Sequence, residues 1–249
     1  MFVSQHILLI HIQIINNMNK IRKIIQKTGF DLHRVHKGAT KMEYLGHLNV
    51  NTVLDIGANE GQFATEIRSI LPHAHIYSFE PIRDCFLNLQ KKFTSDKNFT
   101  AFNFGLGSER GIVTMNKNVY TPSSSLLEMA DAHKKLFPHT ISSSEETITI
   151  ECLDDQIDNI HIRNNLLIKV DVQGFEDRVI TGGIKTFKNA HAILIENSFV
   201  TLYKNQPLFD DIYNTLTGIG FTYKGSLQEK VDHVTGAIVS EDSLFIRKN

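Results

Sequence analysis

Short apolar strand patterns alternate with helix patterns from residue 52 onward, and this alternation constrains the fold more than any other feature. Residues 52–67, TVLDIGANEGQFATEI, pass from a run of β-forming side chains through a glycine-containing turn into a helix pattern. A strand pattern at residues 75–80, a helix pattern at 84–93 and a strand pattern at 99–107 follow. Elements that alternate at this spacing indicate parallel β-α-β units with helices on both faces of a sheet. The sequence therefore predicts an α/β fold.

The same alternation resumes in the second half of the chain. Two glycines, Gly182 and Gly183, interrupt one of its helix patterns. The two final strand patterns are joined by a turn-rich stretch, so an antiparallel pair at the sheet edge is expected. In chain order, these elements are a strand at 165–171, a helix at 175–187, a strand at 190–196, a helix at 209–216 and strands at 221–225 and 243–248.

A long, serine-rich connection separates two strand patterns that alternate apolar and polar side chains. These patterns lie at residues 111–118 and 146–152, and the connection, residues 119–145, contains the triplet SSS twice. A connection of this length is usually functional or disordered. It is either a lid that closes over a substrate or a loop without substrate contact. We predict one domain of residues 48–249 with this insertion, preceded by a helical extension of residues 1–47.

The N-terminal extension carries a basic excess. The first 50 residues hold seven Lys or Arg against two acidic residues, although the net charge of the chain is −1. Residues 20–28 combine isoleucines at helical spacing with basic side chains, so a basic amphipathic helix is expected. Such a helix either docks on the domain or contacts an anionic membrane surface. Residues 7–15 are apolar, but the run is too short to span a bilayer, and Met18 is an alternative first residue.

The overall composition disfavours several classes of partner and site. A net charge of −1 argues against a general nucleic-acid binder. Cys85 and Cys152 are the two cysteines, and neither lies in a C-x-x-C pair, so a disulfide framework is not expected. The twelve histidines show no paired spacing of a zinc site. We therefore expect a cytoplasmic protein. If the basic helix contacts a membrane surface rather than the domain, the protein is also peripherally membrane-associated.

Polar residues follow the strand patterns where a doubly wound sheet binds its ligands. Asp55, Gly57, Asn59 and Gly61 come at the first strand-to-helix turn, and Glu80 lies nineteen residues beyond Gly61. An acidic side chain at that place accepts hydrogen bonds from two ribose hydroxyls. The dinucleotide pattern G-x-G-x-x-G is absent, and Asp55 would repel a pyrophosphate but suits an ammonium group. S-adenosylmethionine combines a ribose with such an ammonium group.

The order of six motifs resembles that of FkbM-type S-adenosylmethionine-dependent methyltransferases. The motifs are VLDIGANEGQF, YSFEP, FNFGLGS, SSSLL, LIKVDVQGFE and DSLFIRK, and the resemblance covers about residues 48–249. It implies a Rossmann-like class I methyltransferase fold, with a mostly parallel seven-stranded sheet that ends in an antiparallel strand. It also implies O-methylation of a hydroxyl on a saccharide, a glycan precursor or a natural product. The alternatives are a donor-binding scaffold subunit without catalysis and, less well matched, an NAD-dependent oxidoreductase.

The resemblance also assigns residues to the donor. Glu80 would hold the ribose, and Pro81 would shape the turn after it. The expected cofactor-binding residues are Asp55, Gly57, Ala58, Asn59, Gly61, Phe63, Glu80 and Pro81.

Asp171 is the expected catalytic residue. A sugar hydroxyl is a poor nucleophile and needs its proton removed as the new bond forms. Asp171 ends the strand pattern nearest the expected methyl group, although an aspartate there also serves to cap a helix or anchor a loop. Relatives often have an acid at the place of Gln173, which cannot act as a base but can position a hydroxyl. If that acid has a role, Glu176 is the residue that could compensate.

A metal-assisted reaction is a second expectation. Asp171, Glu196 and Asn197 offer three oxygen ligands at neighbouring strand ends, a donor set that suits Mg²⁺. A divalent ion there would lower the pKa of the acceptor hydroxyl. In the alternative, Glu196 and Asn197 only hydrogen-bond the loop that follows them.

Overall fold

The computed structural model describes residues 40–118, 124–136 and 143–248, together with residue 27. The chain divides into two units, Met1–Ala39 and Thr40–Asn249. The expected basic helix at residues 20–28 lies outside the described residues except for Lys27. In the part of the chain that the structure describes, no helix has the length and apolar character needed to cross a membrane.

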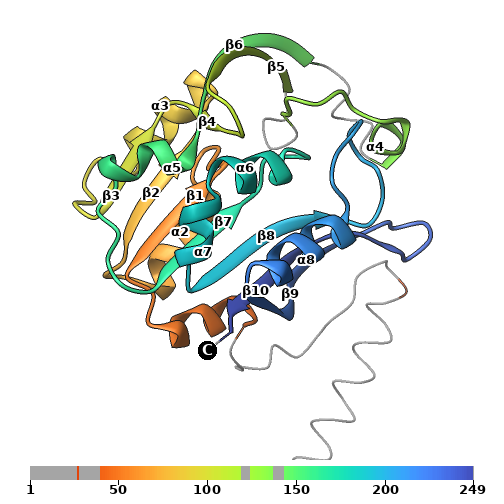
Figure 1. Cartoon of the computed structure of the whole chain (residues 1–249). Coiled ribbons are helices and arrows are strands. Elements are labelled where there is room, and N and C mark those ends of the chain that lie inside the picture. The colour runs from red at the N-terminus through yellow and green to blue at the C-terminus, as the bar shows by residue number, and fades with distance from the viewer. Residues whose placement is uncertain (1–26, 28–39, 119–123, 137–142, 249) are drawn as a thin grey trace, which may run out of the picture. The chain divides into compact units, whose positions relative to one another are not determined.

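The second unit is built on a seven-stranded sheet with the order β3-β2-β1-β7-β8-β10-β9 (Figure 1). Strands β3, β2, β1, β7 and β8 are mutually parallel, whereas β10 is antiparallel to both β8 and β9. This arrangement confirms the predicted α/β fold with an antiparallel C-terminal pair. The strands are β1 (Thr52–Ile56), β2 (His75–Phe79), β3 (Phe99–Phe102), β7 (Leu166–Val170), β8 (Ala192–Ser198), β9 (Phe221–Val231) and β10 (Ile238–Arg247).

A second, three-stranded sheet has the order β4-β6-β5 and is formed by β4 (Gly105–Leu106), β5 (Gly111–Asn118) and β6 (Ser143–Glu151). The prediction of one strand over residues 99–107 was wrong, because this stretch divides between the two sheets. Asn103 marks the division: its side-chain amide donates to the carbonyl oxygens of Glu80 and Pro81, both at 3.0 Å. These bonds hold the bend where β2 has ended, and the chain leaves the first sheet there.

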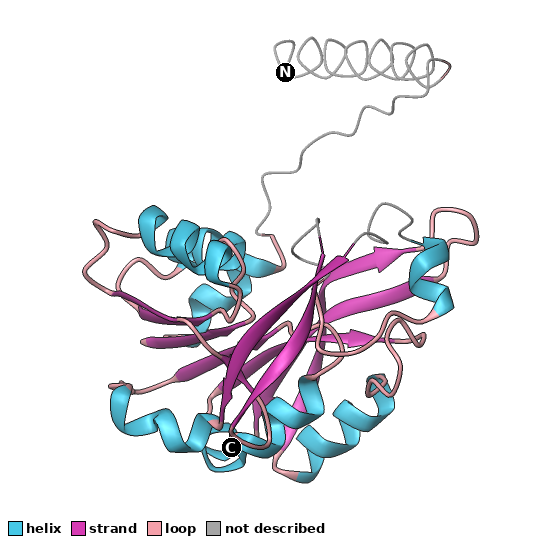
Figure 2. Ribbon diagram, turned by 90° about the horizontal axis from the view of Figure 1, so that it is seen from above, coloured by secondary structure: helices cyan, strands magenta, loops and turns pink. Residues whose placement is uncertain are grey.

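Helices lie on both faces of the large sheet (Figure 2). The 3-10 helix η1 (Met42–Leu48) and α2 (Gln62–Ile70) contribute to one apolar cluster, whereas α6, α7 and α8 contribute to the other. The predicted break at Gly182–Gly183 is confirmed, since α6 ends at Gly182 and α7 begins at Ile184. The remaining helices are α3 (Arg83–Lys92), α4 (Asp131–Leu136), α5 (Leu153–Gln156), η4 (Ile157–Asn159), α6 (Glu176–Gly182), α7 (Ile184–Asn189) and α8 (Phe209–Gly218).

Strand alternation decides which side chains meet at the functional edge of the sheet. In β1, Leu54 and Ile56 belong to the cluster under α6 to α8, whereas Val53 belongs to the cluster under α2. Since successive side chains of a strand point to opposite faces, Asp55 lies on the α2 face. Its register neighbours Ser78 on β2 and Lys169 on β7 lie on the same face. A polar row therefore crosses the sheet on this face.

Candidate functional site

A cavity of about 390 Å³ opens beyond the carboxyl ends of β1, β2 and β7. This size lies within the roughly 300–1,000 Å³ typical of small-molecule sites. One wall is apolar and comes largely from the second sheet, with Leu106, Met115 and Ile150 among its residues. The polar and charged part of the lining includes Lys169, Asp171, Gln228 and Lys230. The predicted residues Gly57, Ala58, Asn59, Phe63, Glu80 and Pro81 all line the cavity.

The β1–α2 turn needs its glycines for space as well as for conformation. Gly57 has a φ of +78°, and a Cβ there would lie 1.9 Å from the carbonyl oxygen of Asp171. A Cβ on Gly61, also at a φ of +78°, would lie 2.7 Å from the Leu89 side chain. The amides of Gly57 and Ala58 both donate to the Phe79 carbonyl, each at 3.1 Å. The turn is therefore packed tightly between the ends of β2 and β7.

Glu80 is buried, and the backbone holds both of its carboxylate oxygens. The amide of Asn59 donates to Oε2 and the amide of Ile82 donates to Oε1, each at 2.8 Å. Each oxygen keeps a further lone pair for a hydroxyl hydrogen. Burial raises the pKa of Glu80 to about 7, although these two amide bonds oppose the rise. Glu80 therefore presents two fixed acceptor oxygens at the place where the sequence predicts a ribose contact.

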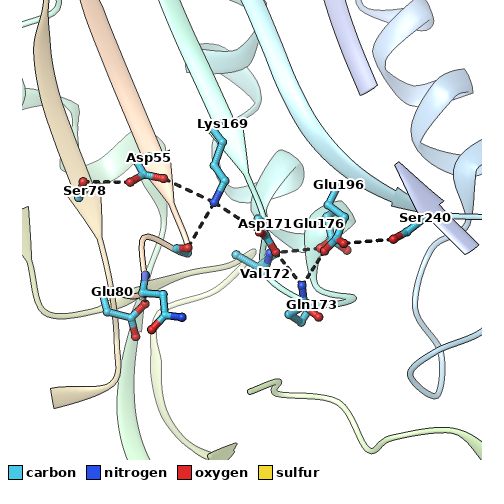
Figure 3. A network of polar contacts seen from close by, with 12 residues as sticks. Asp55, Ser78, Glu80, Lys169, Asp171, Val172, Gln173, Glu176, Glu196 and Ser240 are labelled. Carbon is cyan, nitrogen blue, oxygen red and sulfur yellow. Dashed lines mark hydrogen bonds and ion pairs between the residues drawn. The ribbon is translucent and has the colours of Figure 1, made fainter. Parts of the chain in front are cut away.

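Asp55 occupies a different position from the one expected. It is fully buried and is not among the residues that line the cavity. Its Oδ2 accepts a 3.2 Å hydrogen bond from the Ser78 hydroxyl, and its Oδ1 lies 3.5 Å from Nζ of Lys169 (Figure 3). Burial raises the pKa of Asp55, and the Lys169 ammonium opposes that rise. Lys169, rather than Asp55, faces the cavity, so the contact of Asp55 with a donor ammonium stays a prediction.

Lys169 is the functional-site residue that sequence reasoning missed. Its Nζ donates to the Gly57 carbonyl at 3.4 Å and lies 3.6 Å from Oδ2 of Asp171. Burial acts to lower the pKa of Lys169, but the carboxylates of Asp171 and Asp55 outweigh it and raise the pKa. The available signal was a single lysine in the otherwise apolar strand pattern LLIKV.

Asp171 directly follows β7 and lines the same cavity as Glu80. Burial acts to raise its pKa, but Lys169 and Lys230 lower the pKa to about 2. Asp171 is therefore ionised at neutral pH and can accept a proton from a substrate group. This position suits the predicted base, and the assignment of that role stays a prediction.

Gln173 and Glu196 lie beside Asp171 on its far side from Lys169. Nε2 of Gln173 donates to Oδ1 of Asp171 at 2.7 Å and to Oε2 of Glu196 at 2.6 Å. Lys230 pairs with the other oxygen of Glu196, which also accepts a bond from Ser240 at 3.3 Å. Burial and the charge of Asp171 raise the pKa of Glu196 to about 7. Figure 3 shows this continuous network from Ser78 to Ser240.

Glu176, the acid suggested as a substitute for Gln173, holds the loop backbone. Its Oε1 accepts bonds from the amides of Val172 at 3.3 Å and Gly174 at 3.1 Å. Burial raises its pKa to about 8. Glu176 is not among the residues that line the cavity.

The predicted magnesium ligands do not converge. Ile193 and Ile195 of β8 face the cluster under α6 to α8, so Asn197 points to that face. Glu196 points to the opposite face, where it contacts Gln173 and Lys230. Among the described residues, no group of three or more His, Cys, Asp or Glu side chains could hold a metal ion. The expectation of a site formed by Asp171, Glu196 and Asn197 was therefore wrong.

The described part of the serine-rich insertion contacts the site. Ser124 lines the cavity, and the Ser125 hydroxyl donates to the Gln173 carbonyl at 2.6 Å. Residues 119–123 and 137–142 of the insertion lie outside the described residues. Whether the insertion closes as a lid stays a prediction.

Comparisons with known proteins agree on methyl transfer. The family model of the methyltransferase FkbM domain matches residues 55–223. A curated relative, 2-O-methyltransferase NoeI of Sinorhizobium fredii (strain NBRC 101917 / NGR234), is 24% identical over 160 residues. That match covers 62% of this chain and 66%, just under two thirds, of the relative.

Solved methyltransferase structures are also similar, at low sequence identity. Precorrin-6y C5,15-methyltransferase from Geobacter metallireducens GS-15 has a TM-score of 0.41 and 9% identity, over 88% of this chain and 91% of the other. SMU.1697c, a putative methyltransferase from Streptococcus mutans in complex with SAH, has a TM-score of 0.44 and 10% identity, over 85% and 99%. Likenesses of this size carry no conclusion about activity. The family match covers more than half of the chain, which therefore belongs to the FkbM methyltransferase family.

Proposed function

We propose that the protein transfers a methyl group from S-adenosylmethionine to a hydroxyl oxygen of a saccharide, free or as part of a glycan precursor or natural product. The observation that carries the proposal is that Glu80 and Asp171 line the same cavity. Glu80 offers two acceptor oxygens that suit the two hydroxyls of a ribose. Asp171 offers an ionised carboxylate that suits the proton of an acceptor hydroxyl.

The lining of the cavity fits the proposed donor. A Cβ on Gly57 would collide with the Asp171 carbonyl, so glycine keeps this turn close to the end of β7 at the cavity wall. Glu80 offers two acceptor oxygens for the ribose. Leu106, Met115 and Ile150 form an apolar wall of the kind that an adenine ring packs against. When bound, the donor supplies an electrophilic methyl group on a sulfonium.

The chain's own residues would remove the acceptor's proton and hold the reacting groups in line. As the hydroxyl oxygen forms its bond to the methyl carbon, the carbon–sulfur bond breaks and its electron pair stays on sulfur. The hydroxyl proton passes to the Asp171 carboxylate. Lys169 and Gln173 keep that carboxylate in place through the contacts at 3.6 and 2.7 Å. In-line orientation of this kind can supply roughly 7–11 kcal/mol of the barrier.

The acceptor class rests on two further observations. The relative NoeI is named as a 2-O-methyltransferase, so an oxygen is the methyl acceptor in that protein. In this chain, the exposed residues Gln228 and Lys230 line the same cavity as Asp171. Amide and ammonium groups at such a rim can hydrogen-bond the several hydroxyls of a sugar.

Calorimetry and a transfer assay test the proposal. The purified protein is titrated with S-adenosylhomocysteine and, for comparison, with NAD⁺. It is then incubated with radiolabelled S-adenosylmethionine and a panel of methyl glycosides, each beside its 2-deoxy counterpart. We expect S-adenosylhomocysteine alone to bind, and label to enter a glycoside but not the matched 2-deoxy compound. Binding without transfer to any hydroxyl compound would favour a donor-binding scaffold, and no binding by the folded protein would refute the proposal.

A further inference from the structure

Gln173 has an unfavourable backbone conformation at the centre of the site. Its φ is +53°, in the left-handed region, and Gly174 follows with a φ of +99°. A non-glycine residue in that region is strained and persists only where its surroundings hold it. Here the Ser125 hydroxyl donates to the Gln173 carbonyl at 2.6 Å, and Glu176 accepts the amide of Gly174 at 3.1 Å. The fold therefore maintains this conformation at a cost.

The result of this conformation is a side-chain amide in which both hydrogens and the oxygen are bonded. Nε2 donates to Asp171 at 2.7 Å and to Glu196 at 2.6 Å. Oε1 accepts a 2.9 Å bond from the hydroxyl of Tyr203, a buried side chain. The reversed amide would place its oxygen against two carboxylates, so the carboxylates fix which way the amide faces, and the hydroxyl of Tyr203 holds the amide oxygen in place.

A second contact supports the position of Tyr203. Nε2 of His133, on α4, lies 3.2 Å from the Tyr203 hydroxyl oxygen. Since that hydroxyl donates its hydrogen to Gln173, His133 would donate from Nε2. The amide of Gln173 is thus oriented by residues from two other segments of the chain.

The cavity lining shows how Gln173 would act. Asp171 lines the cavity, whereas Gln173 and Glu196 are not among its lining residues. Two neighbouring carboxylates repel each other and would separate or share a proton unless donors lie between them. Gln173 supplies those donors, so its effect on a ligand passes through the Asp171 carboxylate.

We propose that Gln173 is a positioning residue for methyl transfer: its amide holds the carboxylates of Asp171 and Glu196 together, so that Asp171 faces the transferring methyl and the acceptor's proton. This inference rests on the proposed function. The departure from the acidic residue of relatives is then not a loss of function, because an amide can donate a hydrogen bond to each of the two carboxylates, whereas an ionised carboxylate has no hydrogen to donate. A purely structural role, in which Gln173 only shapes the loop, makes different predictions.

Two donor analogues separate these roles without an identified acceptor. S-adenosylhomocysteine lacks the methyl group, whereas sinefungin carries an amine, protonated at neutral pH, in its place. The ratio of their dissociation constants therefore reports on the carboxylate that faces the methyl position. Both ligands are titrated calorimetrically into wild type, Gln173→Leu, Gln173→Gly and Tyr203→Phe, and the melting temperature of each variant is measured.

The two Gln173 variants differ in backbone strain but both lack the amide. Glycine adopts a positive φ freely, so Gln173→Gly would relieve the strain that Gln173→Leu retains. In both variants, we expect the preference for sinefungin over S-adenosylhomocysteine, measured as the ratio of their dissociation constants, to fall about tenfold. The affinity for S-adenosylhomocysteine itself should stay within about threefold of wild type. Tyr203→Phe should lower the preference for sinefungin about threefold, because the amide stays but its oxygen loses the hydrogen bond from the tyrosine hydroxyl. Asn205→Gly is the matched control, since Asn205 is exposed and also left-handed, with a φ of +59°, and should leave both affinities unchanged.

The outcomes distinguish this inference from the proposed function. An unchanged ratio in folded Gln173→Leu and Gln173→Gly overturns the positioning role while leaving the proposed function standing. Equal losses for both ligands indicate a structural role and also overturn it. If the wild type binds neither ligand, the proposed function fails and the inference falls with it.

Discussion

Nζ of Lys169 lies 3.6 Å from Oδ2 of Asp171, and the same ammonium lies 3.5 Å from Oδ1 of Asp55. One buried cation thus joins the turn after β1 to the carboxylate after β7. Gly57 completes the connection by accepting a bond from Nζ at 3.4 Å. The Lys169 ammonium therefore holds both the β1–α2 turn, which is expected to bind the donor, and Asp171, the proposed base. Substitution of Lys169 should affect both.

Lys169→Met should be strongly destabilising because it leaves Asp55 buried without its cation. Removal of one partner from a buried pair typically costs about 3–5 kcal/mol. The double variant Asp55→Asn/Lys169→Met removes the uncompensated charge and should recover part of that loss. Urea unfolding of wild type, both single variants and the double variant measures the coupling. If the losses in unfolding free energy of the two single variants add up to that of the double variant, a direct interaction between Asp55 and Lys169 would be contradicted.

Glu80 should make donor binding depend on pH. Its pKa is raised by burial to about 7, so the carboxylate takes up a proton as the pH falls below neutrality and then has less capacity to accept ribose hydroxyls. We expect roughly tenfold weaker binding of S-adenosylhomocysteine at pH 6 than at pH 8. Glu80→Gln should bind weakly at both pH values and show no such dependence. Calorimetry at the two pH values tests this, and a variant with wild-type affinity would remove Glu80 from the donor site.

The sequence predicted the fold because the determining signals were local. Apolar runs, Gly182–Gly183 and the spacing of Glu80 from Gly61 are all visible within short windows. The predicted strand over residues 99–107 failed because Asn103 turns the chain through bonds to residues more than twenty positions away. Such a contact has no signature in the local pattern.

The residues of the candidate site were likewise predicted only in part from the sequence. Glu80 and Gly57 line the cavity, whereas Gly61 and Asp55 are not among its lining residues. Asn197 was grouped with Asp171 and Glu196 as a metal ligand, although the period-two pattern of Ile193 and Ile195 places it on the opposite face from Glu196. By contrast, the contact of Gln173 with Tyr203 joins residues thirty positions apart and depends on tertiary structure. Side-chain networks of this kind cannot be derived from residue type and spacing.

Asp171→Asn should separate binding from transfer. The asparagine keeps the size of the side chain but cannot accept the hydroxyl proton, so transfer should fall by roughly 10²–10⁴-fold. The affinity for S-adenosylhomocysteine should change little. Asp177→Asn is a suitable control, because Asp177 lies nearby in the first turn of α6, is partly exposed and pairs with Arg178. Unchanged transfer by Asp171→Asn, measured with the acceptor that the glycoside panel identifies, would exclude Asp171 as the base.

Glu176 should make the protein less stable as the pH rises. Burial raises its pKa from 4.5 to about 8 in the folded state, so the folded state binds this proton more tightly than the unfolded state does. The stabilisation from Glu176 is then fully present below about pH 4.5 and is lost as the pH rises through about 8. Glu176→Gln mimics the protonated acid and has no charge to lose. Relative to wild type, the variant should therefore gain stability between pH 5.5 and pH 8.5, by about 3 kcal/mol. Urea unfolding at both pH values measures the difference, and a constant offset between the two proteins would show that Glu176 is ionised throughout.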